Sequence, residues 1–205
     1  EYDSKQASKQ ASKQIISKQY FSLLKEASEI VGIQLFQVKR LYLKDCLMRV
    51  DNIKWTDHQE DSFEYIDLSS VSRDDHKIIN TNEITINNAP SRAKQIVHKD
   101  DALFGTTRPQ FQRITIIPQQ LNNQICSSGF CVMRADKDIV LPRWIFYMIS
   151  TSSFKLHVER YEKRASYPSI SDGNVMKYKL LIPSLKVQNY IVSILDKFDT
   201  LVHDL

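Results

Sequence analysis

The sequence predicts a mixed α/β (α+β) fold, with one central domain flanked by long amphipathic helices of the coiled-coil type at both termini. Three observations predict it: a four-residue repeat at the start, a heptad pattern at the end, and short β-rich runs between them. With 205 residues, 42% of them hydrophobic, the chain can bury one sizeable core. We therefore divide it into a spacer helix over residues 1–34, a central domain over residues 35–183 and the start of a second helix over residues 184–205.

The N-terminal segment carries a tetrapeptide repeat. SKQA at residues 4–7 recurs at residues 8–11, and SKQI at residues 12–15 and SKQ at residues 17–19 follow. Because an α-helix has 3.6 residues per turn, positions four apart drift by only about 40° and share one stripe. Tyr20, Leu23, Ala27 and Ile30 continue this stripe, and Gly32 is a suitable stop. The pattern predicts a helix over residues 4–31.

The C-terminal segment carries a heptad pattern that begins after Pro183. Its apolar residues are spaced by four, three, four, three and four positions, which is typical of helices that pair in coiled coils. A helix with one apolar stripe is not stable alone in water, so the terminal helices are expected to pack on each other, on a partner chain or on their own domain. The predicted helix-pairing seam consists of Val187, Ile191, Ile194, Phe198, Leu201, Leu205, Tyr20, Leu23 and Ala27.

The central domain has the pattern of alternating short strands and helices. Strands are predicted at residues 63–68, 83–86, 113–117, 130–134 and 178–182, with polar turns between them. Helices are predicted at residues 141–149 and 151–161, and Pro142 suits the first position of the former. Acidic residues are concentrated between positions 51 and 75, and basic ones between positions 92 and 113, although the net charge is only +4. One face is therefore expected to be basic.

Motifs that would indicate catalysis or a bound cofactor are missing. None of the four glycines stands in a phosphate-binding frame, and the five histidines lack metal-ligand spacing. The sequence has no NPPY run of an amino-methyltransferase, no PD followed by ExK of a nuclease and no GxSxG of a serine hydrolase. We expect neither enzymatic activity nor a cofactor or metal.

The cellular setting follows from the cysteines and the apolar runs. Cys46, Cys126 and Cys131 form no CxxC pair and are odd in number, which favours core thiols over disulfides or zinc ligands. Apolar runs are far shorter than the roughly 20 residues that span a bilayer. We expect a soluble cytoplasmic protein without a membrane partner.

Several phrases together resemble the specificity subunits of type I restriction-modification systems. SRAKQ at residues 91–95, DALFGTTRP at residues 101–109 and SSGF at residues 127–130 match one stretch of that family. YPSIS at residues 167–171, IPSL at residues 182–185 and ILDKFD at residues 194–199 match the stretch that closes its domain. The likeness is collinear from about residue 41 to residue 205. Asp100 stands where the family usually has glycine, and Asp51 and Asn52 replace another glycine.

The resemblance implies a non-catalytic target recognition domain that reads part of a split DNA sequence. The implied partners are double-stranded DNA, the modification (methyltransferase) subunits, the restriction subunit and a second copy or another recognition domain. Full-length members carry two such domains, so the chain resembles a half subunit, and two identical copies would favour a palindromic bipartite target. Some members carry four-residue repeats in the helical spacer, which leads to the hypothesis that the SKQA repeats set the target spacing.

Candidate DNA contacts follow from residue chemistry. Arginine pairs well with guanine, and glutamine with adenine, whereas lysine and arginine in loops suit phosphates. The interpretation assigns base reading to Arg108, Gln110, Gln112 and Arg113. It assigns phosphate contact to Arg92, Lys94, Lys163, Arg164 and Tyr167. The alternatives are a solvated loop for the base-reading residues and a buried ring for Tyr167.

Two other classes of protein compete with this interpretation. A protein-interaction adaptor would use the heptad helices as its whole function, with a middle domain that binds protein or has decayed from recognition. A restriction enzyme that cleaves unaided would need nuclease and nucleotide motifs, and the sequence has neither.

Overall fold

The computed structural model describes residues 38–163 and 166–203, together with residues 22, 25, 26, 29 and 32. Two compact units emerge from the backbone contacts. The larger is Leu41–Leu180, and the other joins Glu1–Arg40 to Leu181–Leu205. This division does not test the domain boundaries expected from the sequence, residues 35 and 183, which stay a prediction.

Two four-stranded sheets form the larger unit. The first has the order β2-β9-β6-β7 and consists of β2 (Leu47–Met48), β9 (Phe130–Ala135), β6 (Ala102–Gly105) and β7 (Ile114–Ile116). The second has the order β4-β3-β8-β5 and consists of β4 (Asn82–Ile84), β3 (Phe63–Ile66), β8 (Gln124–Ser127) and β5 (Ala93–Val97). Every pairing is antiparallel except that of β3 with β8. A separate two-stranded sheet pairs β1 (Lys39–Tyr42) with β10 (Lys179–Ile182).

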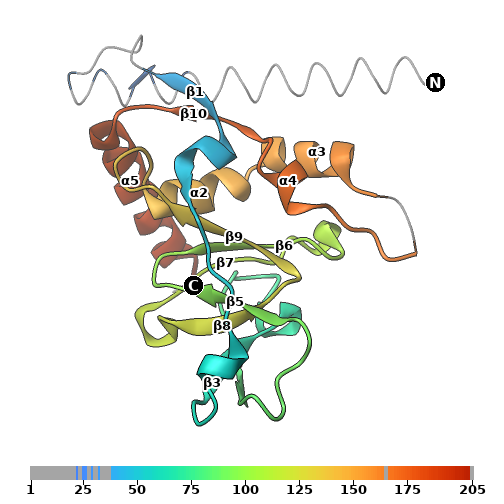
Figure 1. The fold of residues 1–205 in the computed structure, drawn as a ribbon. Helices are drawn as coiled ribbons and strands as arrows, with labels where there is room; N and C mark the ends of the chain where they lie inside the picture. The colour runs from blue at the N-terminus through green and yellow to red at the C-terminus, as the bar shows by residue number, and fades with distance from the viewer. Residues whose placement is uncertain are drawn as a thin grey trace. The chain divides into compact units, whose positions relative to one another are not determined.

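Helices cover the first sheet. The α2 helix (Pro142–Ile149) has proline at its first turn and packs on β6, β7 and β9 (Figure 1). The α3 helix (Ser152–Tyr161) follows after two residues, and the hydroxyl of the second, Thr151, accepts a hydrogen bond from the Phe154 amide. Phe154 is buried and meets Phe104 of β6 edge to face, with ring centroids 5.0 Å apart. The short α4 helix is Asp172–Val175.

Apolar side chains of both sheets form a core cluster between them. Leu103 and Val132 from the first sheet cluster with Ile66, Val97 and Cys126 from the second. A smaller cluster on the other face of the second sheet gathers Ile53, Tyr65, Ile84, Ala93 and Ile125. All three cysteines are buried and free, as expected of core thiols, and burial raises the pKa of the Cys46 thiol to about 11.

An ion pair joins the two sheets at their edge. The Arg134 guanidinium of β9 donates from Nε and Nη2 to the two oxygens of Asp101, at 3.0 and 2.8 Å. Nη2 also donates to the carbonyl of Ile96 in β5, at 3.1 Å. Asp101 is 2% exposed and accepts a further bond from the His98 amide. The bidentate geometry and the additional bonds satisfy a carboxylate that would otherwise be costly to bury.

The preceding turn places Asp100 at the position where the resembled family usually has glycine. Its φ is 73°, in the left-handed region that glycine adopts without steric cost. The turn therefore keeps the backbone shape of a glycine turn, and the Asp100 carboxylate instead lies 3.1 Å from Lys137.

The mixed α/β class and most predicted elements are confirmed. The runs at residues 63–68, 83–86, 113–117, 130–134 and 178–182 overlap β3, β4, β7, β9 and β10, and both predicted helices are present. Sequence patterning missed β1, β2, β5, β6 and β8. The β6 strand is buried on both faces, so its sequence ALFG has no polar alternation to reveal it. The expectation that Lys94 lies in a loop was wrong, because it lies within β5.

The smaller unit contains α5 (Leu185–His203), a helix of 19 residues that coincides with the heptad pattern. Val187 and Ile191 are buried, whereas Ile194 and Phe198 are 37% and 61% exposed. Of the predicted N-terminal helix, residues 22, 25, 26 and 29 are helical, and Gly32 follows with a φ of 68°. Tyr20, Leu23, Ala27 and Leu205, as well as the Leu201 side chain, lie outside the described residues. None of the described helices is long and apolar enough to cross a membrane.

Asp101→Asn is expected to lower the free energy of unfolding by about 3–5 kcal/mol, because it leaves the Arg134 charge without its carboxylate partner. Urea unfolding followed by circular dichroism measures this change. Asp100→Asn is the matched control and should cost less than about 1 kcal/mol, because its pair with Lys137 is largely solvated. Equal midpoints for the two variants would contradict this role of Asp101.

Candidate nucleic-acid interface

The loop over residues 106–113 projects from the end of β6 and has an unusual backbone. Arg108 and Gln112 both adopt left-handed conformations, with φ of 50° and 48°, on either side of the 3₁₀ turn η5 (Pro109–Phe111). Pro109 is buried, whereas Arg108 and Gln110 are exposed. Non-glycine residues in this region cost free energy, and such strain tends to occur at functional sites. The turn displays Gln110 at the surface.

Backbone hydrogen bonds bring four distant segments to this loop. The Arg92 carbonyl accepts from Ser128, and the neighbouring Gly129 carbonyl accepts from Thr106, both at 2.8 Å. The Thr106 carbonyl accepts from Ile170 at 3.0 Å, and the Arg108 amide donates to Pro168 at 2.7 Å. Lys163 forms an isolated antiparallel β-bridge with Ser169 of the same segment. We call these adjoining segments, residues 92–94, 106–113, 163 and 166–170, the basic edge.

Arg108 and Tyr167 form a pair on the basic edge. The guanidinium carbon of Arg108 lies 4.7 Å from the centroid of the Tyr167 ring. Tyr167 is 67% exposed, so the alternative of a buried ring was wrong. Lys163 is exposed nearby in the chain, and Arg164 lies outside the described residues. The stack limits the motion of a guanidinium and leaves its edge open to hydrogen-bond acceptors.

Lys94 lies at a β-bulge in β5. The register of β5 with β8 shifts between Ala93 and Gln95, which leaves Lys94 as the extra, exposed residue. Gln95, which sequence analysis did not single out, donates its amide to the carbonyls of Ser127 and Phe130 at 3.2 and 2.9 Å. The Gln95 side chain thus fixes the turn between β8 and β9 that carries Gly129. Its place in the SRAKQ phrase was the signal for it.

Arg113 differs from the other proposed base-reading residues. Its side chain is half-buried, and its guanidinium donates to the carbonyls of Leu68 and, at 2.7 Å, Val71. Burial and the nearby charge of Arg73 lower the pKa of Arg113. These contacts favour a structural role for Arg113, which holds the segment after β3 against the loop.

Close packing by Leu68 accounts for two glycines at the base of the basic edge. A Cβ atom built on Gly105 or on Gly129 would lie 3.1 Å from a methyl carbon of Leu68. Both glycines therefore allow Leu68 to approach closely between the two sheets. Close packing thus accounts for Gly129, the glycine of the SSGF phrase, at this position.

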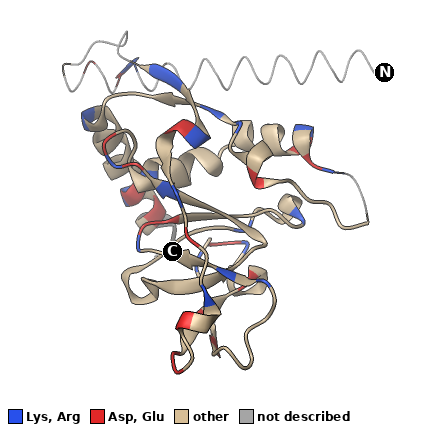
Figure 2. Cartoon of the chain, viewed as in Figure 1, with Lys and Arg blue, Asp and Glu red and all other residues tan. Residues whose placement is uncertain are grey.

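The basic edge carries unpaired positive charge. Within the described part of the chain, no ion pair involves Arg92, Lys94, Arg108 or Lys163. Figure 2 shows basic positions in the η5 loop and along β5, and acidic positions in the loop around η3 (Trp55–Asp57). The acidic and basic stretches of the sequence thus occupy different loops. Free cations beside exposed amides suit a polyanion that offers both phosphates and hydrogen-bonding edges.

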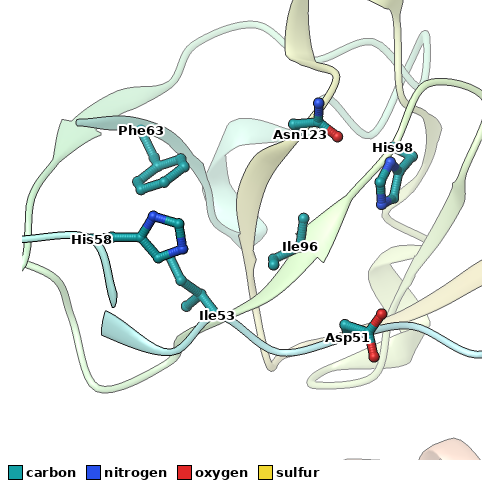
Figure 3. Close-up of a pocket in the computed structure, with 7 residues that line it drawn as sticks. All are labelled: Asp51, Ile53, His58, Phe63, Ile96, His98 and Asn123. Carbon is teal, nitrogen blue, oxygen red and sulfur yellow. The ribbon is translucent and has the colours of Figure 1, made fainter. Parts of the chain in front are cut away.

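A pocket of about 300 Å³ lies on the face of the second sheet with the smaller cluster, and its lining includes no residue of the basic edge. In Figure 3, His58 and Phe63 lie to one side of Ile96, and His98 and Asn123 to the other. His58 is bonded to Asp61 at 2.7 Å. Among the described residues, no group of three potential ligands could hold a metal ion. The lining contains no lysine or arginine and consists of Asp51, Ile53, His58, Phe63, Ile96, His98 and Asn123.

Comparison with known proteins identifies relatives of this fold. A chain described as the crystal structure of the HsdS subunit from Thermoanaerobacter tengcongensis superposes with a TM-score of 0.75 at 28% identity, over 82% of this chain and 43% of that one. A second solved chain, described under complex assembly and conformational transition of the type I R-M system, gives a TM-score of 0.76 at 28% identity and the same coverage. The type I restriction enzyme HindI specificity subunit of Haemophilus influenzae is 27% identical over 128 residues, which are 60% of this chain and 28% of that protein.

These relatives define the class as the specificity subunits of type I restriction-modification systems. The family model for the type I restriction modification DNA specificity domain matches residues 35–205. The chain belongs to this family, and the resemblance on the SRAKQ, TTRP and SSGF phrases is confirmed. It carries one such specificity domain. It spans less than half the length of the relatives that it matches.

Arg113→Ala is expected to lower the free energy of unfolding by about 1.5–3 kcal/mol, because two partly buried carbonyls lose a charged donor. Arg108→Ala removes only an exposed stack and should stay within about 1 kcal/mol of the parent protein. Thermal or urea unfolding of both variants gives the comparison. A destabilised Arg108→Ala beside an unaffected Arg113→Ala would reverse the roles assigned to the two arginines.

Proposed function

We propose that the chain is a sequence-specific DNA-binding specificity subunit, or half subunit, of a type I restriction-modification system. In this proposal it directs methyltransferase and restriction subunits to a bipartite DNA target and performs no chemistry itself. The single observation that supports the DNA contact best is the basic edge. There, three of the four adjoining segments carry exposed cations without an ion pair among the described residues, and the loop between β6 and β7 adds the exposed Gln110.

The proposed contacts divide into two kinds. Arg92, Lys94 and Lys163 are exposed cations without an acidic partner among the described residues, which suits phosphates. Arg108, Gln110 and Gln112 belong to the strained turn and suit base edges, because a fixed backbone limits the geometries that a side chain can offer. Tyr167 steadies Arg108 and lies beside the phosphate-binding group.

The partner surface of the proposal is the α5 seam. Ile194 and Phe198 remain substantially exposed on α5, and apolar side chains at heptad positions suit a second helix. We place the modification subunits, and a second recognition domain from another copy or another chain, on this seam. Two identical copies would read a palindromic pair of half-sites.

Binding assays separate this function from that of an adaptor that uses only its helices. Affinity for random duplex DNA should fall steeply with salt, with a log–log slope near −0.9 for each phosphate contacted. Selection from a random library, with the modification subunit present, should then return one preferred site. Binding to the modification subunit without any affinity for DNA would favour the adaptor.

Lys94→Ala and Gln110→Ala are expected to impair DNA binding in different ways. Lys94→Ala should weaken binding to all sequences and reduce the magnitude of the salt slope by about 1. Gln110→Ala should leave that slope unchanged and relax one position of the selected site. Fluorescence anisotropy at several salt concentrations and library selection give the two readouts.

Lys179→Ala, on β10, and Gln59→Ala, in the loop around η3, are the matched controls, because both residues are exposed and lie outside the basic edge. Neither control should change affinity or the selected site. An unchanged site for Gln110→Ala would remove that residue from the base-reading set. A control that behaved like Lys94→Ala would move the interface away from the basic edge.

Insertion of one further SKQA unit is expected to lengthen the unread spacer of the target. Four helical residues add about 6 Å, which is one or two base-pair steps of roughly 3.4 Å. Library selection with the lengthened protein measures the spacer directly. A scrambled four-residue insertion of the same composition tests whether length alone matters, and an unchanged spacer in both would refute the hypothesis.

A further inference from the structure

A second surface loop lies against the basic edge and carries an arginine that sequence analysis did not single out. After β3, the chain makes a tight hairpin in which Val71 bridges Ile78. The Ser72 amide donates to Lys77 at 2.9 Å, and the Ile79 amide donates to Ser70 at 2.9 Å. Arg73 is exposed on this hairpin. Because its neighbours in sequence, Asp74 and Asp75, are acidic, the local charge pattern did not indicate Arg73 as a DNA contact.

The hairpin is fixed to the 106–113 loop from both sides. Arg113 of the loop holds the carbonyls of Leu68 and Val71 at the base of the hairpin. The guanidinium carbon of Arg73 lies 3.9 Å from the centroid of the Phe111 ring. This is the separation of two groups in van der Waals contact through the ring face. Phe111 stands in the chain between Gln110 and Gln112.

The stack on Phe111 determines what Arg73 offers to a ligand. The ring occupies one face of the guanidinium, whereas its N–H donors point outward in the guanidinium plane. Among the described residues, no hydrogen bond and no carboxylate engages these donors. Asp75 of the same hairpin instead accepts from the Lys77 amide and pairs with its ammonium group.

The charge on Arg73 is also poorly compensated. Arg73 lies close enough to Arg113 to contribute, after burial, to lowering the pKa of Arg113, and the carboxylate of Asp67 acts in the opposite direction. Two guanidinium groups near one another repel, and among the described residues no carboxylate lies within ion-pair distance of Arg73. An electron-rich acceptor in the guanidinium plane would relieve this repulsion.

We propose that Arg73 is a further specificity-determining residue, which donates in its plane to the O6 and N7 acceptors of a guanine in the major groove. The proposal rests on the proposed function and adds the 70–79 hairpin to the surface that reads DNA. Guanine is the base favoured here, because it presents two acceptors in the geometry that a guanidinium fork matches. Phe111 is a positioning residue, which fixes the plane of the fork.

Library selection with the full chain and its modification subunits tests the proposal through Arg73→Ala and Arg73→Lys. Arg73→Ala should lose the preference for guanine at one position and bind the parent site roughly 5- to 150-fold more weakly. Arg73→Lys keeps the charge but not the fork, so it should lose the same preference while nonspecific affinity is retained. Phe111→Leu should relax the same position in part. Arg49→Ala, at an exposed arginine that pairs with Asp51, is the control and should change nothing.

The outcomes distinguish the inference on Arg73 from the proposed function on which it rests. A parent protein that selects one site, with variants at Arg73 that select the identical site, would overturn the inference and leave the proposed function intact. Full rescue of affinity and site by Arg73→Lys would show a phosphate contact and would also overturn base reading. A parent protein that selects no site at all would overturn both. The melting temperature of each variant confirms that a loss of binding is not a loss of fold.

Discussion

The Asp101 carboxylate lies between the two sheets at 2% exposure and accepts from the Nε and Nη2 atoms of Arg134. Arg134 belongs to the first sheet, and its bond to the Ile96 carbonyl reaches the second. A charge of this kind is tolerated in a core only when nearly every hydrogen-bonding position is filled. The pair therefore requires one relative placement of β5, β6 and β9, which an apolar core alone would specify less sharply.

The basic edge depends on that placement, because its segments leave from the ends of the same strands. Residues 106–113 follow β6, the Ser128 and Gly129 turn precedes β9, and Arg92 precedes β5. Once the strands are fixed, the hydrogen bonds from Ser128 to Arg92 and from Thr106 to Gly129 hold the loops in place. The rigid strands thus offset the conformational free energy that the left-handed residues Arg108 and Gln112 cost. Variable loops on a fixed two-sheet frame would allow different sequences to be read without a change of fold.

Patterns of residues predicted the parts of the fold that are locally encoded. Periodicity located α2, α3 and α5, and β-rich runs with polar boundaries located β3 and β9. The strands β6 and β8 were not predicted, because their burial on both faces removes the alternation of polar and apolar residues. The candidate contacts Arg92, Arg108 and Lys163 were proposed from residue type, yet only hydrogen bonds between distant segments show that they adjoin. No local signal distinguishes Arg113, which holds carbonyls, from Arg73, which is exposed on the Phe111 ring.

Amide hydrogen exchange of the full chain, with and without its selected duplex and in the presence of the modification subunits, tests most directly whether the basic edge contacts DNA. The account predicts slower exchange on DNA binding in residues 106–113 and 166–170, and no change around His58 and His98 at the separate pocket. Protection confined to that pocket, or no protection of residues 106–113 while DNA is bound, would contradict it.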